Sequence, residues 1–156
     1  FEKFPNRVEL KKFIEIKRQN AKRDECIFYL PSKYTKAPYW IRSINKANAK
    51  IIAHTAIRLS EDFDIKKIVL KEHPSTSLEV TSAIKKILEK KVKVRLWKNH
   101  LEENNITENI HEAAMLQFRY AIFSCKSSAI SYTRTLSPNT QLLFTSFFGD
   151  HQGEIK

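Results

Sequence analysis

The stretch that decides the fold is residues 65–74, which read IKKIVLKEHP and end in a His-Pro pair. Its central apolar run is continuous, as expected for a strand that is covered on both faces of a sheet. Proline lacks an N–H and biases the residue before it toward extended geometry, so the strand is expected to continue to His73 and then turn. Helical periodicity follows over residues 75–91, where Ser77 is a candidate N-cap. This unit is therefore predicted to be a strand that leads into a helix.

The same alternation of strand and helix recurs along the chain. Strands are expected over short apolar runs at residues 26–30, 65–71, 92–97, 120–123 and 141–144. Helices are expected at residues 6–23, 38–58, 75–91, 107–118 and from Ser127 or Ser128 to Leu136, with an acidic loop at residues 60–64. Strands that alternate with helices of about 10 to 15 residues predict right-handed crossovers and a parallel sheet. The predicted fold class is α/β, a three-layer α/β/α Rossmann-like domain with a mainly parallel sheet of about five strands.

The predicted Rossmann-like domain covers residues 25–147 of the 156-residue chain. Residues 1–24 are expected to form an N-terminal helix, with apolar side chains among lysines and arginines. This helix is expected either to be an amphipathic surface helix or to pack against an absent domain. The chain does not begin with methionine, so such a domain could precede Phe1. Residues 148–156 are expected to be a polar tail.

The composition bounds the partners and the compartment. A formal charge of +11 favours an anionic partner, namely nucleic acid, anionic lipid or an acidic polymer, and the alternative is a set of solvated lysines. No apolar stretch reaches the roughly 18 to 20 residues that span a bilayer, and no signal peptide is recognisable. Cys26 and Cys125 lie in apolar runs without metal-ligand spacing, so they are expected to be buried thiols in a protein of the reducing cytoplasm.

Glycine content excludes two kinds of nucleotide site. The chain has two glycines, Gly149 and Gly153, so neither a P-loop nor a three-glycine dinucleotide fingerprint can be built. A bound phosphate would therefore be held by helix N-terminal amides and by side chains. The histidines have no metal-ligand spacing, so no metal site is expected.

The first candidate site residue is His73. In a parallel sheet it would lie at the carboxyl edge, where open α/β sheets bind ligands. An imidazole there can protonate a leaving phosphate or donate a hydrogen bond to it. Lys71, two residues earlier, is expected on the same face of the strand. The alternative is an ordinary surface histidine at the end of a strand.

The second candidate is the pair Ser127-Ser128, at the predicted start of a helix. Backbone amides, the helix dipole and two hydroxyls would then converge on an anion, with Lys126 adding charge. The alternative is a simple N-cap.

Two further side chains are candidates for the same site. Glu112, in the preceding predicted helix, can hold two ribose hydroxyls or be a solvated carboxylate. His100 is expected in a loop that follows the third strand, and this loop would also lie at the carboxyl edge.

The order of these motifs resembles the C-terminal nucleotide-binding half of bacterial GT-B sialyltransferases and polysialyltransferases, which use CMP-sialic acid. That family carries a His-Pro motif after one strand and a serine motif at a later helix start. The matching segments here are Lys71-Glu72-His73-Pro74 and Phe123-Ser124-Cys125-Lys126-Ser127-Ser128-Ala129, and the resemblance covers residues 26–146.

The resemblance implies a role for each candidate residue. His73, with Pro74, would be the general acid toward the CMP phosphate, and Ser127 and Ser128 would bind that phosphate. Glu112 would hold the ribose, and Lys71 would be the basic residue beside the histidine. No metal or other cofactor is implied.

The resemblance also implies binding partners and a catalytic base that this chain does not contain. The partners would be a nucleotide sugar and a glycan acceptor, and the protein would act in the cytoplasm or peripherally on the inner face of an anionic membrane. The family's catalytic base lies in an Asp/Glu-Asp/Glu-Gly tripeptide of an N-terminal domain, and this chain has no such tripeptide. The chain is therefore expected to be either a fragment, with a preceding domain that supplies the base, or not a complete enzyme of this kind. The alternative function is a basic α/β domain that binds nucleic acid without catalysis.

Overall fold

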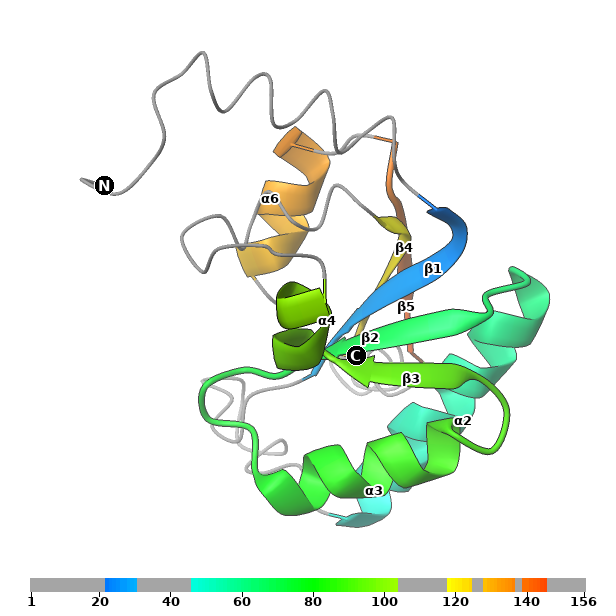
Figure 1. The fold of residues 1–156 in the computed structure, drawn as a ribbon, viewed down its shortest axis with the longest axis vertical. Helices are drawn as coiled ribbons and strands as arrows, with labels where there is room; N and C mark the ends of the chain where they lie inside the picture. Colours follow the sequence, from blue (N-terminus) through cyan, green and yellow to red (C-terminus); the bar gives the residue numbers. More distant parts are fainter. Residues whose placement is uncertain (1–21, 31–45, 104–117, 125–127, 137–138, 146–156) are drawn as a thin grey trace, which may run out of the picture.

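The computed structural model describes residues 22–30, 46–103, 118–124, 128–136 and 139–145. These residues form a single five-stranded sheet with helices on both faces, so the predicted α/β Rossmann-like fold is confirmed (Figure 1). The strands are β1 (Lys22–Tyr29), β2 (Lys67–Lys71), β3 (Lys93–Leu96), β4 (Phe118–Phe123) and β5 (Gln141–Phe144). The helices are α2 (Lys46–Asp62), α3 (Leu78–Leu88), α4 (Trp97–Glu103) and α6 (Ser128–Leu136).

The strand order contains one reversal of direction. The sheet runs β3-β2-β1-β4-β5, and every pairing in it is parallel. The chain therefore moves from β1 to β2 and β3 on one side, then returns to place β4 and β5 on the other side of β1. Open α/β sheets bind ligands at the carboxyl edge where the order reverses. In this chain that point lies between β1 and β4.

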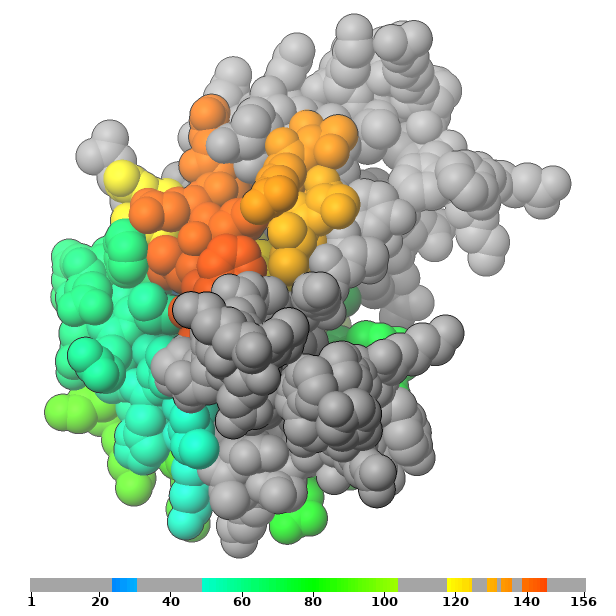
Figure 2. Space-filling model, turned by 180° about the vertical axis from the view of Figure 1, so that it is seen from behind, coloured from blue at the N-terminus to red at the C-terminus, as the bar shows by residue number. Residues whose placement is uncertain are grey.

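The helices form two layers. Helices α2 and α3 pack on each other and on one face of the sheet, whereas α4 and α6 cover the opposite face (Figure 1). Figure 2 shows the edge strand β5 at the surface between α2 and α6.

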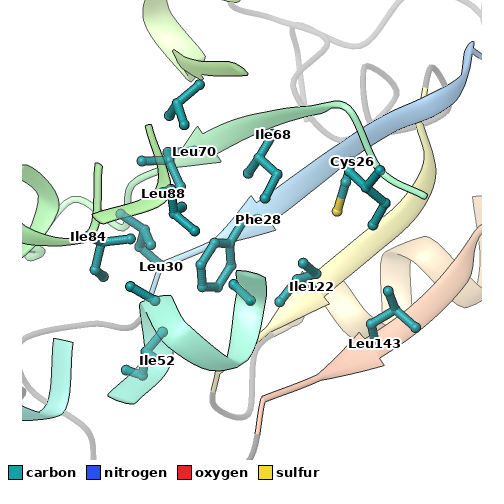
Figure 3. Close-up of a cluster of buried hydrophobic side chains, with 14 of the residues drawn as sticks. Cys26, Phe28, Leu30, Ile52, Ile68, Leu70, Ile84, Leu88, Ile122 and Leu143 are labelled. Atoms are coloured by element: carbon teal, nitrogen blue, oxygen red, sulfur yellow. The ribbon is translucent and has the colours of Figure 1, made fainter. Parts of the chain in front are cut away.

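Each layer has its own core, because successive side chains of a strand point to opposite faces. Cys26 and Phe28 of β1 face α2 and α3, where Phe28 packs with Ile52 and Ile84 (Figure 3). Ile27 and Tyr29 face the other layer. Because both faces are covered, the inner strands β2 and β4 are apolar on both sides, whereas the edge strand β3 keeps polar alternation.

The end of α2 differs from the prediction. The helix extends to Asp62 and includes residues that were expected in an acidic loop. It ends in a Schellman motif, in which the Ile65 N–H donates to the Ser60 carbonyl at 2.8 Å and the Asp64 N–H to Glu61 at 3.4 Å. Asp64 has a positive φ of 54°, a conformation that is usually supplied by glycine. The missing glycine is why the sequence did not reveal this helix end.

Other boundaries shift by a few residues. β1 begins at Lys22, so Lys22 and Arg23 belong to a strand and not to the predicted first helix, because Lys22 pairs with Phe118. Phe118 likewise begins β4. β2 begins at Lys67, and Trp97 begins α4 where the end of a strand was predicted.

Several predictions are confirmed at their bounds. Ser77 is the N-cap of α3, and its Oγ accepts from the Val80 N–H at 3.3 Å. Helix α6 begins at Ser128 and ends at Leu136, and β5 spans Gln141–Phe144. Parts of the helices predicted at residues 6–23, 38–58 and 107–118, namely 6–21, 38–45 and 107–117, lie outside the described residues, as does the polar tail at 148–156.

Candidate functional site

The two motifs singled out in the sequence follow strands that flank β1. β2 ends at Lys71, before the His-Pro pair, and β4 ends at Phe123, before α6. Tyr29 of β1 is the register partner of both Lys71 and Phe123. Two inter-strand spacings separate β2 from β4, which amounts to about 10 Å. The His-Pro turn and the first residue of α6 therefore follow neighbouring positions at one edge of the sheet.

His73 begins a closed turn. Its carbonyl accepts from the Thr76 N–H at 2.9 Å, and its own N–H donates to the Thr76 Oγ1 at 3.0 Å. Pro74 occupies the second position, where its fixed φ suits a type I or II turn. The expectation that the strand continues to His73 is therefore wrong: β2 ends at Lys71, and the His73 N–H bonds within the turn instead of to a neighbouring strand.

The His73 imidazole is exposed and tied to its own turn. Its Nδ1 lies 2.9 Å from the Ser75 Oγ and accepts from the Ser75 N–H at 3.1 Å. Among the residues that the structure describes, Nε2 has no hydrogen-bond partner. The ring thus meets solvent through Nε2, in a position to donate to or accept from a ligand.

Lys71 lies near His73 in the chain but has a different neighbour. Its Nζ is 5.5 Å from the centroid of the Trp97 ring, which is a cation–π distance. The ammonium therefore lies over the start of α4. Since β2 ends at Lys71, the strand alternation that was expected to place Lys71 and His73 on one face does not extend to the histidine.

The serine pair is only partly described. Ser128 is the first residue of α6, which agrees with the predicted helix start. Its side chain, Ser127 and Glu112 lie outside what the structure describes, so their predicted contacts with a ligand stay predictions.

The carboxyl edge also holds two hydroxyls that the sequence analysis missed. Ser124 and Thr145 directly follow the paired residues Phe123 and Phe144, and each is at most 2% exposed. Among described residues neither hydroxyl has a hydrogen-bond partner. A buried polar group without a partner costs about 1–3 kcal/mol, so such groups are candidates for binding. The signal in the sequence was a hydroxyl residue directly after each apolar strand.

His100 does not belong to this edge. It was expected in a loop that lines the cleft, but it lies in α4 and is 2% exposed. Its ring packs on Trp97 and Phe118, with centroid distances of 5.7 and 5.3 Å. Because α4 begins directly after β3, His100 is carried into the core between α4 and the sheet.

Cys26 is a core residue, as predicted. It is fully buried, and this burial raises the pKa of its thiol far above the ordinary value, so the thiol stays neutral. Its Sγ lies 3.3 Å from the Ile27 carbonyl. Cys125 lies outside the described residues.

The opposite, amino edge of the sheet has a pocket of about 470 Å³. It is lined by the end of α2, the segments that join α2 to β2 and α3 to β3, and the start of β3, and its side chains include both lysines and carboxylates. Of the predicted site residues that the structure describes, none lines it. The pocket therefore does not coincide with the candidate site.

Comparison with models of known protein families found no match, and comparison with curated protein sequences found none. In the described part of the chain, no helix is long and apolar enough to cross a membrane. Over the same residues, no group of three or more histidine, cysteine or acidic side chains is arranged to hold a metal ion.

Proposed function

We propose that the chain is the nucleotide-sugar-binding domain of a sialyltransferase-like glycosyltransferase, with CMP-sialic acid as donor. The observation that carries the proposal is the shared carboxyl edge. The His73-Pro74 turn and the start of α6 follow the two strands that flank β1, next to the reversal in strand order. This is the position at which α/β sheets of this type bind nucleotides.

The proposed site uses two sources of phosphate recognition. The first-turn amides of α6, with Ser127 and Ser128, bind the phosphate of CMP. His73 assists departure of that phosphate as a general acid from the other side of β1. Glu112 holds the ribose, and Lys71, whose ammonium lies over the Trp97 ring, adds positive charge at the carboxyl edge. A preceding domain supplies the base that activates the glycan acceptor.

The net charge of +11 supports this proposal, because a basic protein is attracted to anionic acceptors and surfaces. Sialylated acceptors are themselves anionic, as is the inner face of a bacterial membrane. The proposal therefore includes a peripheral position of the protein at that surface.

The direct test is titration of CMP into the full chain, with UMP and inorganic phosphate as controls. CMP at about 100 times its Kd is expected to stabilise the native state by about 2.7 kcal/mol, measured as a rise in Tm. UMP and phosphate are expected to have smaller effects at equal concentration. No binding of CMP at millimolar concentration, by calorimetry or thermal unfolding, would contradict the proposal.

The same charge supports a second candidate, a domain that binds nucleic acid. In that case a single-stranded RNA would bind more tightly than CMP, and its affinity would fall steeply as salt rises. Parallel titrations with CMP and with RNA at two salt concentrations separate the two functions.

A further inference from the structure

We infer that Ser75 is a positioning residue, which fixes the tautomer of His73 so that Nε2–H is presented at the carboxyl edge. Two contacts support this inference. The Ser75 N–H donates to Nδ1 at 3.1 Å, and the Ser75 Oγ lies 2.9 Å from the same nitrogen. Both contacts come from the residue two positions after the histidine, within the turn that Pro74 shapes.

The backbone amide decides the direction of these hydrogen bonds. A backbone N–H can only donate, so Nδ1 must offer its lone pair. In a neutral imidazole one nitrogen carries the proton and the other accepts, so the proton lies on Nε2. The Ser75 hydroxyl rotates to donate to the same lone pair. A proton on Nδ1 would instead face the amide, donor against donor.

The turn holds this arrangement from both ends. The reciprocal bonds between His73 and Thr76 close the turn, at 2.9 and 3.0 Å. Ser77 then caps α3, which anchors the turn to a helix whose Ile84 and Leu88 are fully buried. The orientation of the imidazole is therefore set by local sequence, before any ligand is present.

The consequence for recognition rests on the proposed function. A neutral ring with Nε2–H donates one hydrogen bond, and its natural partner is an anionic oxygen such as that of a phosphate. In its neutral form His73 thus meets the phosphate through a hydrogen bond from Nε2. The general-acid step of the proposed function then requires a second proton on Nδ1, and the contact between Nδ1 and the Ser75 amide opens when the ring takes up that proton.

The test is nitrogen NMR of the full chain labelled with ¹⁵N-histidine, at a pH where the rings are neutral. His73 is expected to show an unprotonated, pyridine-type Nδ1 and a protonated, pyrrole-type Nε2. His54, exposed on α2, provides the reference within the same spectrum. Similar, averaged shifts for both nitrogens of His73, or a proton on Nδ1, would overturn the inference.

Two variants separate positioning from folding. Ser75→Ala keeps the amide and removes the hydroxyl, so the ratio of the Nε2–H to the Nδ1–H tautomer is expected to fall about fivefold, the loss of one ordinary hydrogen bond. Ser75→Thr is expected to restore the ratio. An unchanged ratio in Ser75→Ala would show that the hydroxyl does not position the ring.

Addition of CMP distinguishes the two proposals. If the tautomer is as expected and CMP leaves the His73 Nε2 resonance and the Tm unchanged, the proposed function fails and the positioning of His73 by Ser75 stands. If CMP binds but the His73 nitrogens are averaged, the inference fails and the proposed function stands.

Discussion

Two threonines bracket the last strand, and they have different environments. Thr140 precedes β5 at the amino edge, and its Oγ1 donates to the Phe118 carbonyl at 3.0 Å. Thr145 follows β5 at the carboxyl edge, where its buried hydroxyl has no partner among described residues. The same residue type thus makes a hydrogen bond to the backbone at one edge, whereas at the other its hydroxyl has no partner within the described part of the chain.

The contrast extends to charged groups. Near the amino edge, Glu25 and Lys67 form a largely buried ion pair at 3.5 Å, and Lys66 pairs with Asp64 in solvent. At the carboxyl edge, the exposed His73 ring offers Nε2 to solvent. Charged side chains near the amino edge are therefore paired with each other, whereas the imidazole at the carboxyl edge faces solvent.

The largest expected effect comes from breaking the buried ion pair. Lys67→Met would remove the ammonium that pairs with the buried Glu25 carboxylate, and the free energy of unfolding is expected to fall by about 3 kcal/mol. Urea unfolding measures this change. Lys66→Met is the matched control, because the side chains of Lys66 and Asp64 are 66% and 83% exposed and such pairs contribute less than about 1 kcal/mol. Equal effects of the two variants would contradict the contrast.

The next effect concerns ligand binding at the carboxyl edge. If CMP binds as proposed, His73→Ala removes a hydrogen bond to a charged oxygen, so the affinity for CMP is expected to fall about 10- to 100-fold, with little change in stability. Calorimetric titration measures the affinity. His54→Ala, at an exposed site on α2, is expected to leave it unchanged. A His73→Ala protein that binds CMP normally would remove His73 from the site.

A smaller pair of effects should differ between two buried threonines. Thr140→Val removes a hydrogen bond to the Phe118 carbonyl and is expected to destabilise the protein by about 1 kcal/mol. Thr145→Val removes a buried hydroxyl that has no partner among the described residues and is expected to be neutral or stabilising. Thermal unfolding of both variants checks the signs. If Thr145→Val is the more destabilising of the two, the carboxyl-edge hydroxyl has a structural role.

The smallest effect is expected at the end of α2. Asp64→Gly relieves a side chain in the left-handed region and is expected to stabilise the protein by about 0.5–1 kcal/mol. Asp62→Gly, inside the last turn of the helix, should destabilise it by a similar amount. Denaturant unfolding compares them, and the same sign for both would argue against the Schellman motif.

The parts of the fold that could be predicted had clear local signals. Ser77 and Ser128 mark helix starts next to apolar runs, and the alternation of strands and helices gave the parallel sheet. The start of α4 has no such signal. β3 ends at Leu96 and α4 begins at the next residue, Trp97, so no glycine, proline or loop marks the boundary in the sequence. His100 was therefore assigned to a loop although it packs in the core.

The candidate site was less accessible to the same reasoning. The sequence indicated which strands carry the motifs, and the sheet order then placed those strands on either side of β1. The contact from Ser75 to Nδ1 depends on the ring rotamer and on turn geometry, neither of which is encoded in residue spacing. The hydroxyls of Ser124 and Thr145 are buried without a hydrogen-bond partner among the described residues. This results from tertiary packing, which residue spacing does not predict.

The central position of β1 has a consequence for folding. Its partners β2 and β4 come from distant parts of the chain, since Tyr29 pairs with both Lys71 and Phe123. During synthesis β1 can join β2 early, but its other edge keeps unpaired N–H and C=O groups until β4 emerges. Closure of so long a loop is slow, and the half-built sheet is open to pairing with other chains. The carboxyl edge between β1 and β4 is thus completed only after the first three strands have been made.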